Sequence, residues 1–185
     1  LMFFKNAAVA KLDDLMDADY LDGVKISRII QFEMAFEGII KNGEAHNADL
    51  IVMGSHGANG FQEMFIGSNT EKVVRNSDVP VLVIKREEDT FSASKFVFAS
   101  DFSDEIKKPF EKVVEFVNKF GSHLYLANIN TPNNFKSTKV AQNQMYDFIA
   151  NFKIDNYSTH IYNDVNVEKG ILHFAKSIDA DLIGM

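Results

Sequence analysis

Residues 48–85 read ADLIVMGSHGANGFQEMFIGSNTEKVVRNSDVPVLVIK, and this stretch decides the fold. Two short apolar runs, residues 50–53 and 79–84, have the composition of buried strands, and residues 68–76 between them have the pattern of a helix. A strand, a helix and a second strand in this order form a βαβ unit, which builds parallel sheets. The stretch therefore predicts an α/β fold with a glycine-rich loop between the first strand and the helix.

Composition excludes several classes of protein. Hydrophobic residues make up 46% of the 185 residues, 17 of them Phe, which is enough for a packed core. There is no Cys, so neither a disulfide framework nor a thiolate metal site is possible. A formal charge of -7 argues against binding to nucleic acid. The apolar runs are too short to cross a bilayer, and no basic and apolar leader opens the chain, so we expect a cytoplasmic protein without membrane contact.

The sequence contains an internal repeat. Residues 37–53, EGIIKNGEAHNADLIVM, align with residues 169–185, KGILHFAKSIDADLIGM, at a separation of 132 positions. A solenoid repeat is about 20–50 residues long, so this period indicates duplicated domains. A permuted single domain is the alternative, but we disfavour it because a connection of about ten residues is short for a return to a parallel strand.

The expected elements alternate between helix and strand. The first copy has expected helices at 12–21, 34–46 and 68–76, and strands at 24–30, 50–53 and 79–84. The second has strands at 96–99, 124–129, 157–162 and from 182, and helices at 104–119, 140–152 and 167–178. Gly121 should end one helix, and Pro109 implies that this helix starts late or kinks. We expect one domain part at 1–86, a linker at 87–95 and another domain part at 96–185.

The glycine-rich loop has two interpretations. In an open α/β sheet, ligands bind at the carboxyl ends of the strands, and the helix that begins at Ser68 presents main-chain amides suited to an anion. Gly57 and Gly60 would let a ligand approach the backbone closely. Alternatively, Ser68 and Glu71 form a capping box and satisfy those amides without a ligand. The sequence leaves both open, and it contains neither a P-loop GxxxxGK[ST] nor a GxGxxG motif.

The spacing Gly54-x2-Gly57-x9-Gly67-Ser68, between DLIVM and VPVLVIK, resembles the universal stress protein family. The resemblance implies an open parallel five-stranded sheet with helices on both faces, Rossmann-like and similar to adenine nucleotide alpha hydrolases. It implies two tandem copies, each incomplete: the C-terminal part of one domain at 1–86 and the N-terminal part of a second at 96–185. We therefore expect the chain to be the middle of a longer protein, or to lack segments.

The family resemblance also implies a ligand, ATP with or without Mg²⁺. The turn ASDFS resembles the family's first strand-to-helix turn, so Asp101 would contact adenine or ribose, and Ile129 matches an adenine-packing position. The implied binding residues are Met53, Gly54, Ser55, His56, Gly57, Gly67, Ser68, Asn69, Thr70, Asp101 and Ile129. Ala99 and Ser100 depart from the family's usual Pro-Thr, and neither copy contains a complete set of these residues.

The function implied is an ATP-binding regulatory protein of the stress response. We expect no catalytic residue and no metal ligand set, and at most weak ATP hydrolysis, because nothing beside His56 would orient its ring. The alternative is an interaction module of the same fold that binds no nucleotide. The apolar strand at residues 79–84 would then matter most, because the resemblance implies that it pairs with its equivalent as a homodimer or as a pseudo-dimer within a tandem chain.

Overall fold

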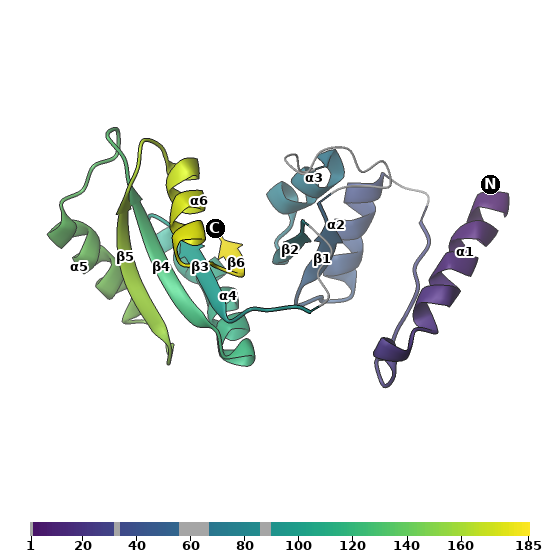
Figure 1. Ribbon diagram of the computed structural model, residues 1–185. Coiled ribbons are helices and arrows are strands. Elements are labelled where there is room, and N and C mark those ends of the chain that lie inside the picture. The colour runs from purple at the N-terminus through teal and green to yellow at the C-terminus, as the bar shows by residue number, and fades with distance from the viewer. Residues whose placement is uncertain (1, 32–33, 56–66, 86–89) are drawn as a thin grey trace. The chain divides into compact units, whose positions relative to one another are not determined.

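The computed structural model describes residues 2–31, 34–55, 67–85 and 90–185, with side chains from residue 5 onward. The chain divides into two compact units, unit 1 at Leu1–Glu87 and unit 2 at Glu88–Met185 (Figure 1). All of the paired strands in the described ranges are parallel. The predicted α/β class is therefore confirmed.

Unit 1 consists of helices and a small parallel sheet. Its elements are α1 (Met2–Met16), the 3-10 turn η1 (Asp19–Leu21), α2 (Ala35–Ala45), β1 (Ile51–Gly54), α3 (Ser68–Asn76) and β2 (Val81–Ile84). β1 and β2 pair from Ile51 opposite Val81 to Gly54 opposite Ile84. The predicted helices at 34–46 and 68–76 and the strands at 50–53 and 79–84 are confirmed to within two residues.

A glycine lets α2 pack close to this sheet. A Cβ placed on Gly43 would lie 3.2 Å from Ile51 Cδ1 and 3.8 Å from Val79 Cγ2. On α3, Val73 is fully buried. The strand–helix–strand unit β1–α3–β2 that the opening stretch of sequence predicts is therefore present, and α2 packs against it.

Two predictions for the N-terminal region are wrong. Residues 24–30 form no strand, although they are rich in β-branched residues. Val24 is 58% and Ile29 47% exposed, so the segment lacks the burial on one face that makes β propensity effective. The helix expected at 12–21 ends at Met16 instead, because Ala18 is extended (φ -72°, ψ 129°), and it begins well before residue 12.

Unit 2 contains a four-stranded parallel sheet with the order β5-β4-β3-β6. The strands are β3 (Lys95–Ala99), β4 (His123–Asn130), β5 (Tyr157–Asn163) and β6 (Leu182–Gly184), and the helices are η2 (Asp104–Ile106), α4 (Lys107–Phe120), α5 (Thr138–Ile149) and α6 (Val167–Ser177). The chain runs outward from β3 to β5 and then returns to the other side of β3, as in doubly wound folds. The five strands implied for a complete copy stay a prediction, since the described parts of the units have two and four.

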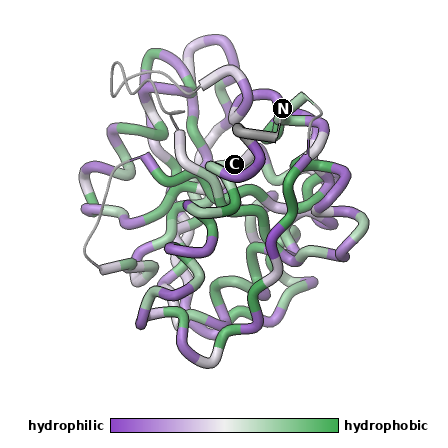
Figure 2. Tube along the Cα trace, turned by 90° about the vertical axis from the view of Figure 1, so that its right-hand side faces the viewer, coloured by the Kyte–Doolittle hydropathy of each residue, from purple (hydrophilic) through white to green (hydrophobic). Residues whose placement is uncertain are grey.

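The core of unit 2 has two layers because side chains alternate along each strand. Phe96 and Phe98 of β3 face the cluster that also contains Phe110 of α4 and Phe148 of α5. Val97 of β3 faces the other cluster, under α6. Figure 2 shows hydrophobic (green) and hydrophilic (purple) stretches following one another along the chain.

The ends of α4 lie where Pro109 and Gly121 predict them. Because α4 begins at Lys107, Pro109 lies in its first turn, where its missing N–H costs nothing. Gly121 ends the helix with φ 65°, and the Ser122 N–H donates to the Val117 carbonyl. The late start and the glycine stop are therefore confirmed.

The sequence repeat corresponds to a repeated structural module. α2 begins and ends 132 residues before α6, and two residues after the end of each helix lies a left-handed residue, Asn47 (φ 49°) or Asp179 (φ 56°). In both copies the next N–H, from Ala48 or Ala180, reaches back to a carbonyl five residues earlier, which is a Schellman motif. A strand follows each time, so the two units share a helix–turn–strand module.

Candidate functional site

Hydrogen bonds join the two ends of the glycine-rich segment at the carboxyl end of β1. The Ser55 N–H donates to the Ile84 carbonyl (2.8 Å) and so extends the sheet pairing by one residue. The Gly67 N–H donates to the Ser55 carbonyl (2.7 Å), and Thr70 Oγ1 donates to the Gly54 carbonyl (3.0 Å). We call Gly54, Ser55, Gly67 and Thr70 the loop base.

The loop base fixes where α3 begins. Gly67 is the N-cap, with φ -60° and ψ 146°, and no side chain caps the helix within the described part of the chain. Ser68 is the first helical residue rather than the cap, and Glu71 pairs with Arg75 (3.1 Å). The predicted capping box is therefore wrong, because the extended cap position falls one residue earlier, on a residue without a side chain.

The predicted residues of unit 1 divide by exposure. Ser55 and Thr70 are buried (3% and 4% exposed), and the Thr70 hydroxyl is used to hold Gly54. Gly54 and the first two residues of α3, Ser68 and Asn69, are exposed, and Met53 and Gly67 are half-buried. His56 and Gly57 lie outside the described residues, as does Gly60. The accessible residues of this site are thus Gly54 at the end of β1 and the first two residues of α3.

The two predicted residues of unit 2 lie on neighbouring strand ends. Ala99 of β3 pairs with Ala127 of β4, and Asp101 and Ile129 each follow two residues later. Asp101 is exposed, and its Oδ1 accepts from the Ser103 N–H (3.0 Å) in the turn after β3. Ile129 is 8% exposed because α6 covers it: a Cβ on Gly170 would lie 2.4 Å from Ile129 Cγ2. The site residues therefore form two groups, one in each unit.

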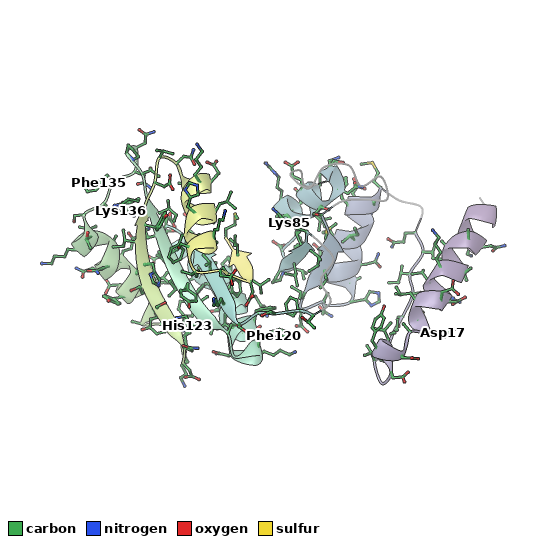
Figure 3. The ribbon with its side chains drawn as sticks, viewed as in Figure 1. Asp17, Lys85, Phe120, His123, Phe135 and Lys136 are labelled. Atoms are coloured by element: carbon green, nitrogen blue, oxygen red, sulfur yellow. The ribbon has the colours of Figure 1, made fainter. Side chains whose placement is uncertain are left out.

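A further depression lies at the carboxyl ends of β4 and β5, with a volume of about 550 Å³. Phe135, which is 73% exposed, lines it together with Asn130, Thr131, Pro132, Asn163, Asp164 and Val165 (Figure 3). His173 Nδ1 lies 2.7 Å from Asp164 Oδ2, and this hydrogen bond lowers the pKa of the Asp164 carboxyl. The sequence analysis missed this feature, although polar residues directly after two neighbouring strands were a usable signal.

Two negative findings apply to the described residues. Across the described ranges, no group of three or more His, Asp or Glu side chains is arranged to hold a metal ion. None of the helices in those ranges is long and apolar enough to cross a membrane.

Residues 4–85 match the family model described as the universal stress protein family. Universal stress protein MJ0577 of Methanocaldococcus jannaschii is 44% identical over 64 residues, which are 35% of this chain and 40% of that protein. Stress response protein NhaX of Bacillus subtilis is 41% identical over 49 residues, or 26% of this chain and 30% of that one. The chain thus spans less than half the length of these relatives.

Structural similarity extends over both units. The crystal structure of a universal stress protein from Archaeoglobus fulgidus covers 97% of this chain with a TM-score of 0.72 and 27% identity, and the match spans 64% of that structure. Residues 4–85 of this chain therefore match the universal stress protein family, and the fold of both units is similar to that of a solved universal stress protein.

Proposed function

We propose that the chain is an ATP-binding regulatory protein of the stress response, with ATP held, with or without Mg²⁺, at the carboxyl end of β1. One observation carries the proposal: α3 begins on Gly67 without a side-chain cap, beside the exposed end of β1. Main-chain amides at a helix N-terminus, together with the positive end of its dipole, bind phosphate well.

Local geometry has to supply this affinity. The chain carries a formal charge of -7, so its overall field opposes a polyphosphate. Exposed Ser68 and Asn69 add polar side chains in the first turn, where their hydrogen-bonding groups can supplement the amides. Hydrogen bonds from Thr70 Oγ1 to the Gly54 carbonyl and from the Gly67 N–H to the Ser55 carbonyl hold the start of α3 against the end of β1.

Asp101 and Ile129 would contact adenine or ribose in the second copy. The exposed carboxylate of Asp101 is compatible with that role. Ile129 offers a ligand only a narrow surface, because it packs under Gly170. We therefore propose unit 1 as the stronger phosphate site.

A charge reversal tests the phosphate site without harming the fold. Ser68→Glu places a carboxylate in the first turn of α3, where it stabilises the helix by about 0.3–1 kcal/mol. The same charge repels a polyphosphate, so ATP affinity should fall by about tenfold or more. Isothermal titration with ATP and Mg²⁺, and the shift in melting temperature, measure the two effects separately.

Thr138→Glu is the matched control, because Thr138 is the exposed first residue of α5 in unit 2. It changes the net charge equally and should leave ATP binding unchanged. ATP at 100 times its Kd stabilises a protein by about 2.7 kcal/mol. If the wild-type protein shows neither heat of binding nor a melting shift with ATP, the proposal fails.

The second candidate is an interaction module that associates through the strand at residues 79–84. In the described part of unit 1, β1 and β2 pair only with each other, and β2 carries the apolar sequence VLVI with Ile84 37% exposed. An apolar strand with an open edge favours pairing with another chain. On this proposal the chain forms a cytoplasmic homodimer, or a pseudo-dimer within a longer tandem protein.

Leu82→Glu should shift the protein to monomers in sedimentation equilibrium. Ile84→Glu, at a more exposed position, keeps the test independent of folding. Val74→Glu is the control, because Val74 is 48% exposed on α3 rather than on the strand. An unchanged association constant in both strand variants contradicts the dimer.

A further inference from the structure

A chain of polar side chains crosses from β4 to β5 in unit 2. His123 Nδ1 lies 2.6 Å from Asn156 Oδ1, and His123 Nε2 lies 2.9 Å from Ser158 Oγ. Ser158 Oγ also lies 2.9 Å from His160 Nε2. His123 lies at the start of β4 (it is labelled in Figure 3), Asn156 directly precedes β5, and Ser158 and His160 lie in β5, so the group lies away from the carboxyl ends of the strands.

The hydrogen bonds among these four side chains can be assigned one consistent set of donors and acceptors. Asn156 Oδ1 only accepts, so His123 carries its proton on Nδ1 and its Nε2 is the acceptor. The Ser158 hydroxyl then donates to His123 Nε2. The remaining oxygen lone pair of Ser158 accepts from His160 Nε2–H. The result is a hydroxyl nucleophile, a base that takes its proton, and an amide that orients the base.

The surroundings keep the two imidazoles in these roles. The His123 ring packs on Tyr125 (4.4 Å between centroids), and the His160 ring packs on Phe174 of α6 (5.0 Å). Burial, and to a lesser extent the nearby His123, lowers the pKa of His160, so His160 stays neutral and continues to donate. Ser158 and His123 are partly exposed and Asn156 is exposed, so the polar network lies at the surface of unit 2.

We propose that Ser158 is an activated nucleophile, and that Asn156, His123 and Ser158 form an acyl-transfer site for an ester or other activated acyl group. Two convergent distances carry this inference, one at each nitrogen of His123. It is independent of the proposed nucleotide site. The loop base lies in unit 1, and Asp101 and Ile129 lie near the carboxyl ends of β3 and β4, whereas these three residues lie near the amino ends of β4 and β5.

The chemical step balances without a cofactor. Ser158 Oγ attacks the carbonyl carbon as His123 Nε2 takes the hydroxyl proton, and the bond to the leaving oxygen breaks. His123 then protonates the leaving group, and water hydrolyses the acyl-serine by the same route. During attack the negative charge builds up on the former carbonyl oxygen of the substrate, and the hydrogen bond from His160 Nε2 positions Ser158 Oγ.

A fluorophosphonate probe tests the nucleophile directly in the full chain. The Ser158 oxygen forms a bond to phosphorus as the P–F bond breaks, and fluoride and the hydroxyl proton leave. Peptide mapping by mass spectrometry should place the label on Ser158. p-Nitrophenyl acetate should release a burst of one nitrophenolate per chain. Absence of both reactions in the folded wild-type protein overturns the proposal.

Three variants distinguish a nucleophile from a purely structural network. His123→Gln removes the base and should slow labelling by about 100-fold or more. Asn156→Asp places a carboxylate against His123 Nδ1, which stabilises the imidazolium and should maintain or raise the labelling rate. Ser177→Ala removes a hydroxyl that donates only to the Phe174 carbonyl, so it should change nothing. Equal labelling rates in the wild type and His123→Gln contradict the mechanism.

Discussion

Thr70 Oγ1 donates to the carbonyl oxygen of Gly54 across 3.0 Å, although the two residues are 16 positions apart in the chain. This bond ties the first turn of α3 to the end of β1. With the bond from Gly67 to Ser55, it positions both ends of the glycine-rich segment. The position of the α3 amides therefore depends on a side chain that is itself buried.

Thr70→Val tests this relationship, because it keeps the shape of the side chain and removes the donor. We expect the free energy of unfolding to fall by about 1 kcal/mol, the usual contribution of one hydrogen bond. If the proposed ATP site is correct, ATP affinity should fall as well, since α3 is then less firmly held. Urea unfolding and calorimetry measure the two quantities. Thr70→Ser keeps the hydroxyl and should retain the hydrogen bond; if it behaves like Thr70→Val, the bond is not the cause.

Gly170→Ala should destabilise unit 2 even though alanine favours a helix by about 1 kcal/mol over glycine. The new Cβ would lie 2.4 Å from Ile129 Cγ2, in a packed layer where overpacking costs about 1–3 kcal/mol. In an Ile129→Ala background the clash is relieved, so Gly170→Ala should become neutral or stabilising. Urea unfolding of the four proteins of this double-mutant cycle measures the coupling. Additive effects would show that the two residues do not clash.

Ser122→Ala should stabilise unit 2. Ser122 is 1% exposed, and within the ranges that the structure describes its Oγ has no hydrogen-bond partner. Burial of an unpaired hydroxyl costs about 1–3 kcal/mol, so its removal should raise the free energy of unfolding by about 1 kcal/mol. Thermal and urea denaturation check the sign. A loss of stability would mean that the hydroxyl is hydrogen-bonded in solution.

Asp181 should make the stability of unit 2 depend on acid pH. Its carboxylate accepts from the Lys95 N–H (2.9 Å) and from Ser92 Oγ (2.9 Å), and the bond from the Lys95 N–H is the main cause that lowers its pKa below the ordinary 3.8. A carboxyl whose pKa is lower in the folded state stabilises the fold above its unfolded pKa, and this stabilisation is lost as the pH falls through the folded value. The wild type should therefore melt above Asp181→Asn at neutral pH, and the difference should shrink as the pH falls below the ordinary pKa of 3.8 and through the lower pKa of the folded state. Asp155→Asn, at another exposed aspartate of the unit, is the control.

Local patterns predicted most of the elements because they act within one turn or one strand. The helix at 68–76 and the αL stop at Gly121 follow from periodicity and from glycine's freedom at positive φ. The strand expected at 24–30 failed because β propensity requires a partner and a buried face, which a local pattern does not supply. The capping box failed because the cap is defined by one extended residue, and that residue is Gly67.

The polar chain of Asn156, His123 and Ser158 could not be predicted from the sequence. His123 and Ser158 are 35 residues apart, and only the register of β4 against β5 brings them together. Sequence spacing can predict a set of catalytic residues only where all of them lie on one helix, strand or turn. Here the sheet positions them.

The sequence by itself determined the parallel α/β architecture and the repeated helix–turn–strand module, because periodicity and turn chemistry are local and occur twice. Only the tertiary structure decided what each copy of a repeated residue does. Gly38 and Gly170 occupy the same position of the repeat, yet a Cβ on Gly38 would meet only the flexible end of the Gln31 side chain, whereas one on Gly170 would meet the packed Ile129. Packing between distant segments sets that difference, and no pattern within either segment encodes it.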